Sequence, residues 1–158
     1  MPNFSYKFPF QLVGTFFIKA ATYEFMHYND RHGGKSHFYS LEYAGENSIW
    51  NLLFTGGNQP PLPHGTTHAD DLIYLFTTDL FERTGHDLEI SQDMTHLWTH
   101  FAKTGDFVTR QNKIVSPWSE SNPVYLKIDV ESEVLRDYIY TWSNPDRKST
   151  CSTINPNP

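Results

Sequence analysis

The hydrophobic residues of this chain gather into a few short segments, which are separated by polar or Gly- and Pro-rich stretches. Aromatic and aliphatic residues recur through residues 12–30 up to the pair Asn29-Asp30, which predicts a helix. Apolar and polar residues alternate from His37 to Tyr43, which predicts a strand. Residues 44–67 are rich in Gly and Pro and predict a long irregular loop.

Two helices are expected in the middle of the chain. The pair Asp70-Asp71 precedes an apolar stretch ending at Phe76, and acids in the first turn suit the helix dipole. A longer helix is predicted over residues 91–103, with Ser91 as its N-cap and Gly105 just past its end. Its apolar stripe consists of Met94, Leu97, Trp98 and Phe101.

The last third of the chain predicts a second strand over residues 124–128 and a helix over residues 131–142. The polar tail from residue 143 to residue 158 has little to bury and is expected to be disordered. Helices alternating with strands indicate an α/β fold. Two strands are too few for a buried sheet, so residues 1–142 are expected to be incomplete on their own.

Composition narrows the class of protein. The length of 158 residues fits one domain, and 38% hydrophobic against 19% charged residues excludes a highly charged disordered chain. The net charge of −6 provides no basic surface for nucleic acid or an anionic bilayer. No apolar run reaches the roughly 20 residues of a membrane helix, so no membrane span is expected. The single cysteine, Cys151, excludes an internal disulfide and a cysteine-based zinc site.

Histidines are the first candidates for chemistry. The pairs His64/His68 and His96/His100 each have the four-residue spacing that places two imidazoles on one helix face. Pro63 and Gly65 exclude a helix around the first pair, and the second pair has neither a following glutamate nor a third ligand nearby. We therefore expect no metal site and no other cofactor. His96 and His100 are expected to flank the apolar stripe, partly solvated.

His68 stands out by its place in the chain. It lies at the end of a loop that follows a predicted strand, immediately before a helix that opens with acids, in the segment GTTHADDLIYLF. Such a loop can hold an imidazole at the carboxyl edge of a sheet, where α/β enzymes place their chemistry. Position alone leaves open whether His68 is catalytic or a surface histidine near a helix N-terminus.

The segment GTTHADDLIYLF resembles the catalytic-histidine segment of the type-B carboxylesterases, and most of all the insect members of that family. Three further segments are similar to this family in the same order: HFYSLEYAG, DMTHLWTHFAKTGD, and the stretch from Trp118 through VYLKI to Trp142. The chain departs from the family pattern at two loops, with Asp106-Phe107 in place of Asn-Pro and Ser119 in place of Pro.

This resemblance implies that residues 1–142 are the C-terminal part of an α/β-hydrolase fold. It also implies a serine carboxylesterase acting on a small-molecule ester, with His68 as the catalytic histidine and no cofactor. The triad order Ser, acid, His places the nucleophile and the acid upstream. No Gly-x-Ser-x-Gly occurs in the chain, so the isolated chain is expected to be inactive. The family resemblance further suggests a secreted protein. The alternative is a non-catalytic esterase-like adhesion or scaffold protein.

Overall fold

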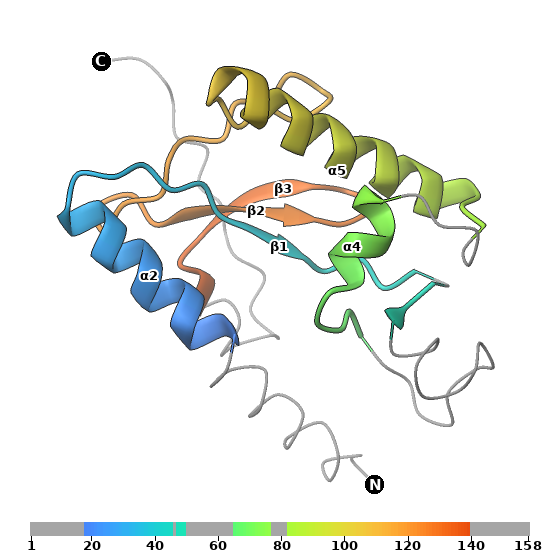
Figure 1. Cartoon of the computed structure of the whole chain (residues 1–158), viewed down its shortest axis with the longest axis horizontal. Helices are drawn as coiled ribbons and strands as arrows, with labels where there is room; N and C mark the ends of the chain where they lie inside the picture. The colour runs from blue at the N-terminus through green and yellow to red at the C-terminus, as the bar shows by residue number, and fades with distance from the viewer. Residues whose placement is uncertain (1–17, 46, 50–64, 77–81, 140–158) are drawn as a thin grey trace, which may run out of the picture.

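The computed structural model describes residues 18–45, 47–49, 65–76 and 82–139. A three-stranded sheet in the order β1-β2-β3 lies at its centre, with β1 parallel and β3 antiparallel to β2 (Figure 1). Figure 1 shows α5 along one side of this sheet, α2 on the other, and α4 near the carboxyl end of β1. The elements are α2 (Ala20–Arg31), β1 (Tyr39–Leu41), α4 (Asp70–Leu75), α5 (Gly85–Thr104), β2 (Val124–Ile128) and β3 (Glu133–Arg136).

The strand β2 is buried on both faces. Leu126 and Ile128 point toward α5, whereas Tyr125 packs in a second cluster on the opposite face of the sheet. A strand covered on both faces reads as a continuous apolar run, which is why VYLKI was recognisable in the sequence. The prediction of a strand at residues 124–128 is confirmed.

The expected strand at residues 37–43 is present as β1 but is shorter. The backbone N–H groups of Glu42 and Tyr43 both donate to Ile128 O, which ends the ladder.

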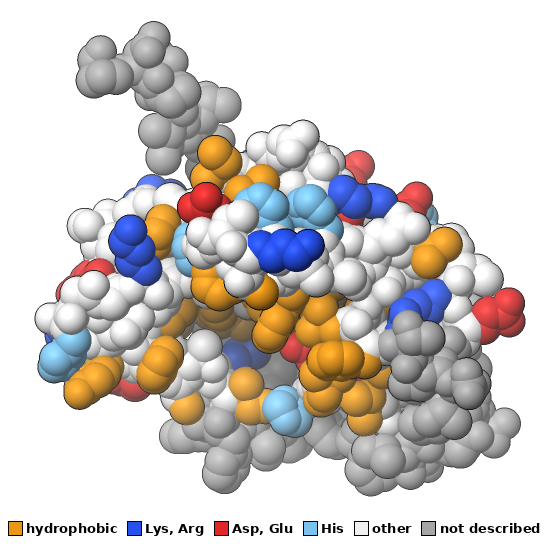
Figure 2. All heavy atoms as spheres, turned by 45° about the horizontal axis from the view of Figure 1, so that its top comes forward, with side chains coloured by type: hydrophobic (Ala, Val, Ile, Leu, Met, Phe, Trp, Pro, Cys, Tyr) orange, Lys and Arg blue, Asp and Glu red, His pale blue; other side chains and the backbone are white. Residues whose placement is uncertain are grey.

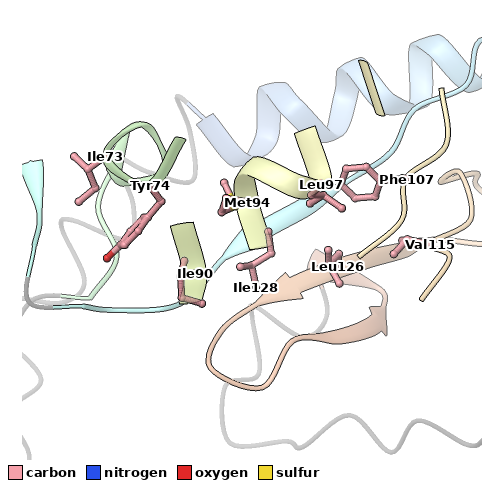
Figure 3. Close-up of a cluster of buried hydrophobic side chains, with 9 residues drawn as sticks. All are labelled: Ile73, Tyr74, Ile90, Met94, Leu97, Phe107, Val115, Leu126 and Ile128. Carbon is pink, nitrogen blue, oxygen red and sulfur yellow. The ribbon is translucent and has the colours of Figure 1, made fainter. Parts of the chain in front are cut away.

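The main core lies between α5 and the sheet. Ile90, Met94 and Leu97 project from α5 onto Leu126 and Ile128 of β2, and no more than 2% of any of these side chains is exposed (Figure 3). Spacings of three and four residues place these α5 side chains on one helix face. Burial of this face holds the helix on the sheet. Trp98 and Phe101, which also belong to the predicted stripe, are 47% and 42% exposed.

The long helix begins earlier than the sequence predicted. It starts at Gly85 after Thr84, so the prediction of Ser91 as N-cap is wrong. Ser91 lies inside the helix, where its buried hydroxyl donates to Tyr74 O at 2.6 Å. The C-terminal prediction is confirmed: Gly105 takes the left-handed conformation (φ 78°), and its N–H bonds Phe101 O at 2.8 Å.

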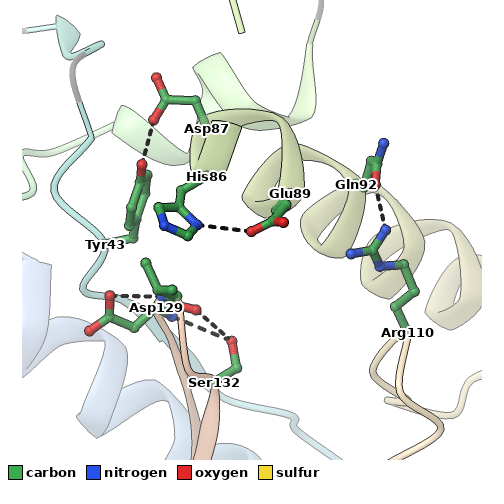
Figure 4. A network of polar contacts seen from close by, with 9 residues as sticks. Tyr43, His86, Asp87, Glu89, Gln92, Arg110, Asp129 and Ser132 are labelled. Atoms are coloured by element: carbon green, nitrogen blue, oxygen red, sulfur yellow. Dashed lines mark hydrogen bonds and ion pairs between the residues drawn. The ribbon is translucent and has the colours of Figure 1, made fainter. Parts of the chain in front are cut away.

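The helix predicted over residues 131–142 is wrong over its first half, because residues 133–136 form β3. Leu135 pairs with Tyr125 across the antiparallel ladder. A turn precedes the strand, in which the Ser132 hydroxyl donates to Asp129 O at 3.1 Å (Figure 4). Pairing with β2 is a tertiary interaction that outweighs the local helix propensity. Residues 140–142 and the predicted tail from residue 143 lie outside the described residues.

The prediction of a helix over residues 12–30 is confirmed for its described part. Helix α2 begins at Ala20, and residues 12–17 lie outside the described residues. The helix ends at Arg31, where the N–H of His32 bonds Asn29 O at 3.2 Å. Its His27 ring packs edge-on against Trp118 with 4.8 Å between ring centroids.

Candidate functional site

His68 lies in a short loop, residues 65–69, that leads directly into α4. Its side chain is exposed. The next residue, Ala69, takes the left-handed conformation with φ 70°. For a non-glycine residue this conformation costs about 1–2 kcal/mol, so the surrounding contacts must hold it in place. The backbone beside His68 is therefore defined by interactions rather than by local preference.

Hydrogen bonds fix the loop at two positions just before His68. The Thr66 hydroxyl donates to Tyr43 O at 2.9 Å, which ties the loop to the residues that follow β1. The Thr67 N–H donates to Asp70 Oδ2 at 2.7 Å. The loop is thus anchored both to the carboxyl end of β1 and to the first turn of α4. This agrees with the position that the sequence predicted for His68, after a strand and before an acid-opened helix.

Asp70 is a buried carboxylate, with 4% of its surface exposed. Besides Thr67 it binds the Ile49 N–H at 2.8 Å, and the Ser48 hydroxyl lies 3.3 and 3.4 Å from its two oxygens. Buried charges are stable when hydrogen bonds replace water, and this carboxylate has two backbone donors and one hydroxyl. Asp70 therefore joins three chain segments next to His68.

Asp71 faces a different partner. The Tyr39 hydroxyl of β1 donates to Asp71 Oδ2 at 3.0 Å. Burial and the negative charge of Asp71 raise the pKa of Tyr39 above its ordinary value. Asp70 and Asp71 thus open the helix, as the sequence predicted, and their carboxylates also bind residues that are distant in sequence.

A second buried carboxylate, Asp87, lies in the first turn of α5 (Figure 4). It accepts hydrogen bonds from the Tyr43 hydroxyl at 2.8 Å and from Asn47 Nδ2 at 2.7 Å, and the Tyr74 hydroxyl lies 3.5 Å away. The backbone of Gly45 approaches so closely that a Cβ there would lie 2.2 Å from Asp87 Oδ1. Sequence analysis missed this cluster. Its only local signal is an acid in a first helical turn, the same signal that marked Asp70 and Asp71.

The other histidine candidates do not join His68. His64 lies outside the described residues. His96 and His100 stack on α5 with 5.8 Å between ring centroids, and both are partly exposed, as predicted. His100 Nδ1 lies 3.0 Å from Asp106 O. Within the described ranges, no group of three or more His, Cys, Asp and Glu side chains is arranged to hold a metal ion.

Large hydrophobic side chains remain exposed around the site. Leu72 on α4 is 46% exposed, Phe76 just after this helix is 62% exposed, and Trp98 on α5 is 47% exposed. Figure 2 shows hydrophobic side chains gathered around a hollow in one face of the molecule.

None of the described helices is long and apolar enough to span a membrane.

Comparison with known proteins assigns the chain to a family. Residues 2–144 match the model of the carboxylesterase family. The chain is also similar to the bile salt-activated lipase of Homo sapiens, with 36% identity over 70 residues. That similarity covers 40% of this chain and 9% of the lipase, so the chain spans a small part of this relative's length. The chain belongs to the carboxylesterase family, which has the α/β-hydrolase fold and is named for the hydrolysis of carboxylic esters.

Proposed function

We propose that this chain supplies the catalytic histidine, His68, of a serine carboxylesterase. The observation that carries the proposal is the placement of His68 at the carboxyl end of β1, in a loop anchored by Thr66 and Thr67, with its ring exposed. Open α/β sheets bind their substrates at this edge. Membership of an ester hydrolase family supports the same role.

In the proposed reaction His68 acts first as general base and then as general acid. It takes the proton of a serine hydroxyl as the serine oxygen attacks the ester carbonyl, and it gives this proton to the departing alcohol. Water then attacks the acyl-enzyme in the same way, which releases the carboxylic acid and restores the serine. A carboxylate would hold the ring and stabilise its charged form. Asp70 and Asp71 bind other groups, so we assign that role to a third carboxylate.

The nucleophile is proposed to lie in a different segment of a longer protein, of which this chain is the C-terminal part. Among the described strands none pairs with the second edge of β1, although β1 is parallel to β2 as in a larger α/β sheet. Trp98 packs edge-on against Tyr39 of this strand while remaining 47% exposed. An edge of β1 that no described strand covers, together with the exposed Trp98 packed on this strand, supports further strands and helices at this side. Loss of a serine nucleophile lowers kcat by about 10⁶-fold, so the chain alone is expected to be inactive.

The proposal is tested on the full-length gene product with two measurements. A fluorophosphonate probe, which reacts covalently with activated serines, should label one serine, and a short-chain aryl ester should be hydrolysed. Both signals should disappear when the labelled serine is replaced by alanine. A folded full-length protein that neither reacts with the probe nor hydrolyses the ester would overturn the proposal and favour the non-catalytic scaffold alternative.

A further inference from the structure

We propose that Asp70 is a positioning residue for His68, which fixes the imidazole by clamping the loop that carries it. This inference rests on the proposed function and deepens it. Asp70 lies two residues after His68, and its side chain is 4% exposed. Its carboxylate binds the backbone N–H groups of Thr67 and Ile49, and none of its hydrogen bonds to described residues involves the His68 ring.

The clamp uses the two oxygens of the carboxylate separately. Asp70 Oδ2 accepts a hydrogen bond of 2.7 Å from the N–H of Thr67, the residue just before His68. Asp70 Oδ1 accepts the Ile49 N–H at 2.8 Å, which belongs to the segment that follows β1. Hydrogen bonds to an ionised acceptor are stronger than neutral ones. One side chain therefore links the His68 loop to a segment that is distant in sequence.

The conformation beside His68 depends on such a link. Ala69 has φ 70°, a left-handed conformation that an alanine avoids unless its surroundings impose it. The Thr67–Asp70 bonds enclose His68 and Ala69, since Asp70 N–H also donates to Thr67 O at 3.2 Å. Weakening the clamp lets the loop relax from this conformation, and the His68 ring moves with it.

An asparagine in place of Asp70 separates this role from simple packing. It has nearly the same size, but only one of its two terminal atoms is an acceptor. Its NH₂ group would therefore meet either the Thr67 or the Ile49 N–H, and one of the two anchors would be lost. A displacement of 1 Å at a catalytic group can lower the rate by about 10²-fold.

Asp87 provides a matched control. It is a carboxylate with 5% exposure, it also binds the segment that follows β1, and it lies near the same helices. None of its hydrogen bonds to described residues reaches residues 65–69. Asp87→Asn should lower stability in a way comparable to Asp70→Asn, while leaving the His68 loop in place.

The experiment compares Asp70→Asn with Asp87→Asn in the full-length esterase. We expect Asp70→Asn to lower kcat by about 10–100-fold with KM changed less than about 2-fold, because ground-state binding does not depend on the general base. In the same variant, amide hydrogen exchange measured by mass spectrometry should accelerate in peptides that cover residues 65–69. Asp87→Asn should leave both the exchange of residues 65–69 and kcat near the wild-type values.

In an active enzyme the inference would be overturned by equal losses of kcat in the two variants, or by unchanged exchange at residues 65–69 in Asp70→Asn. A full-length wild-type protein that is inactive and unlabelled by fluorophosphonate overturns the proposed function, and the catalytic role of Asp70 with it. Should Asp70→Asn not fold, Ser48→Ala weakens the same clamp and keeps the carboxylate. It should lower kcat by about 2–10-fold, the equivalent of one hydrogen bond, and an unchanged kcat would overturn the inference.

Discussion

The hydrogen bond between Tyr39 and Asp71 provides a sharp test of how the acids after His68 are used. Tyr39→Phe removes only the hydroxyl that donates to Asp71 Oδ2 at 3.0 Å. The ring contacts with Trp98 and Phe107, at 6.3 and 6.4 Å between centroids, can remain. The change in stability therefore reports on the polar contacts of this hydroxyl, which include one with Trp98 besides the bond to Asp71, and the double variant described below isolates the bond to Asp71.

The expected magnitude follows from the partners. A hydrogen bond to a charged group contributes about 1.5–3 kcal/mol, and Asp71 is only partly buried, so we expect a loss near the lower end, about 1–2 kcal/mol. Asp71→Asn keeps one oxygen that can accept the Tyr39 hydroxyl but loses the charge, so it should lose part of this amount, plus roughly 0.3–1 kcal/mol because a negative charge is removed from the first turn of α4. The double variant should lose less than the sum, with a coupling energy of about 1 kcal/mol.

The assay is urea unfolding of the intact protein for the wild type, both single variants and the double variant, with ester hydrolysis measured in parallel. Each variant that remains folded should keep most of its activity, because Asp71 binds Tyr39 and carries no proton in the proposed reaction. Strictly additive losses of stability would refute the hydrogen bond. A loss of activity in Asp71→Asn as large as that expected for a missing general base would instead place Asp71 beside His68.

Three further predictions concern the core, alkaline pH and zinc. Met94→Ala, at a fully buried position of α5, should lower the free energy of unfolding by about 2–5 kcal/mol. Ile114→Ala, at a position that is 76% exposed, should change it by less than about 0.5 kcal/mol. Equal effects of the two variants in thermal melts would contradict the described core. Burial and the charge of Asp87 raise the pKa of Tyr74, so its contribution to stability is complete below about pH 10 and is lost as the pH rises further. Unfolding measured from pH 9 to 11 should show a shallower loss in Tyr74→Phe, and identical slopes would contradict this assignment. Micromolar zinc should leave the melting temperature unchanged, because His96 and His100 lack a third ligand among the described residues. Stoichiometric zinc binding that is lost when both histidines are replaced by alanine would contradict this prediction.

The parts of the fold that the sequence predicted correctly are those set by local interactions. Gly105 ends α5 because a left-handed residue is needed there, and a glycine at that position is visible in any single sequence. The acids at 70 and 71 mark the start of α4 for a similarly local reason. The strand β2 was recognisable because both of its faces are buried, which leaves a continuous apolar run.

The errors arose where tertiary contacts decide the structure. Residues 133–136 are a strand because they pair with β2, and nothing within the segment itself records this partner. Ser91 has the chemistry of an N-cap, but its hydroxyl binds Tyr74 O of α4, and the helix begins six residues earlier. A turn signal was present in Asp129–Ser132, between two segments with β-branched residues, and would have favoured a hairpin over a helix.

The candidate site divides in the same way. His68 was identifiable because the motif around it is continuous in sequence. The clamp by Asp70 and the cluster around Asp87 could not be identified from the sequence. Apart from the local bond between Asp70 and Thr67, the partners of these two carboxylates lie 13–44 residues away along the chain. Residues that position a catalytic group often act through such distant contacts, and a structure is needed to find them.

The central claim, that His68 is a catalytic histidine, is tested most directly by kcat for hydrolysis of a short-chain aryl ester by the full-length protein and its His68→Ala variant. The account predicts a loss of several orders of magnitude with the fold intact by circular dichroism, because the general base is gone. His64→Ala, four residues earlier, should have a far smaller effect and serves as the control. A His68→Ala enzyme that keeps its activity while His64→Ala loses it would contradict the assignment of His68.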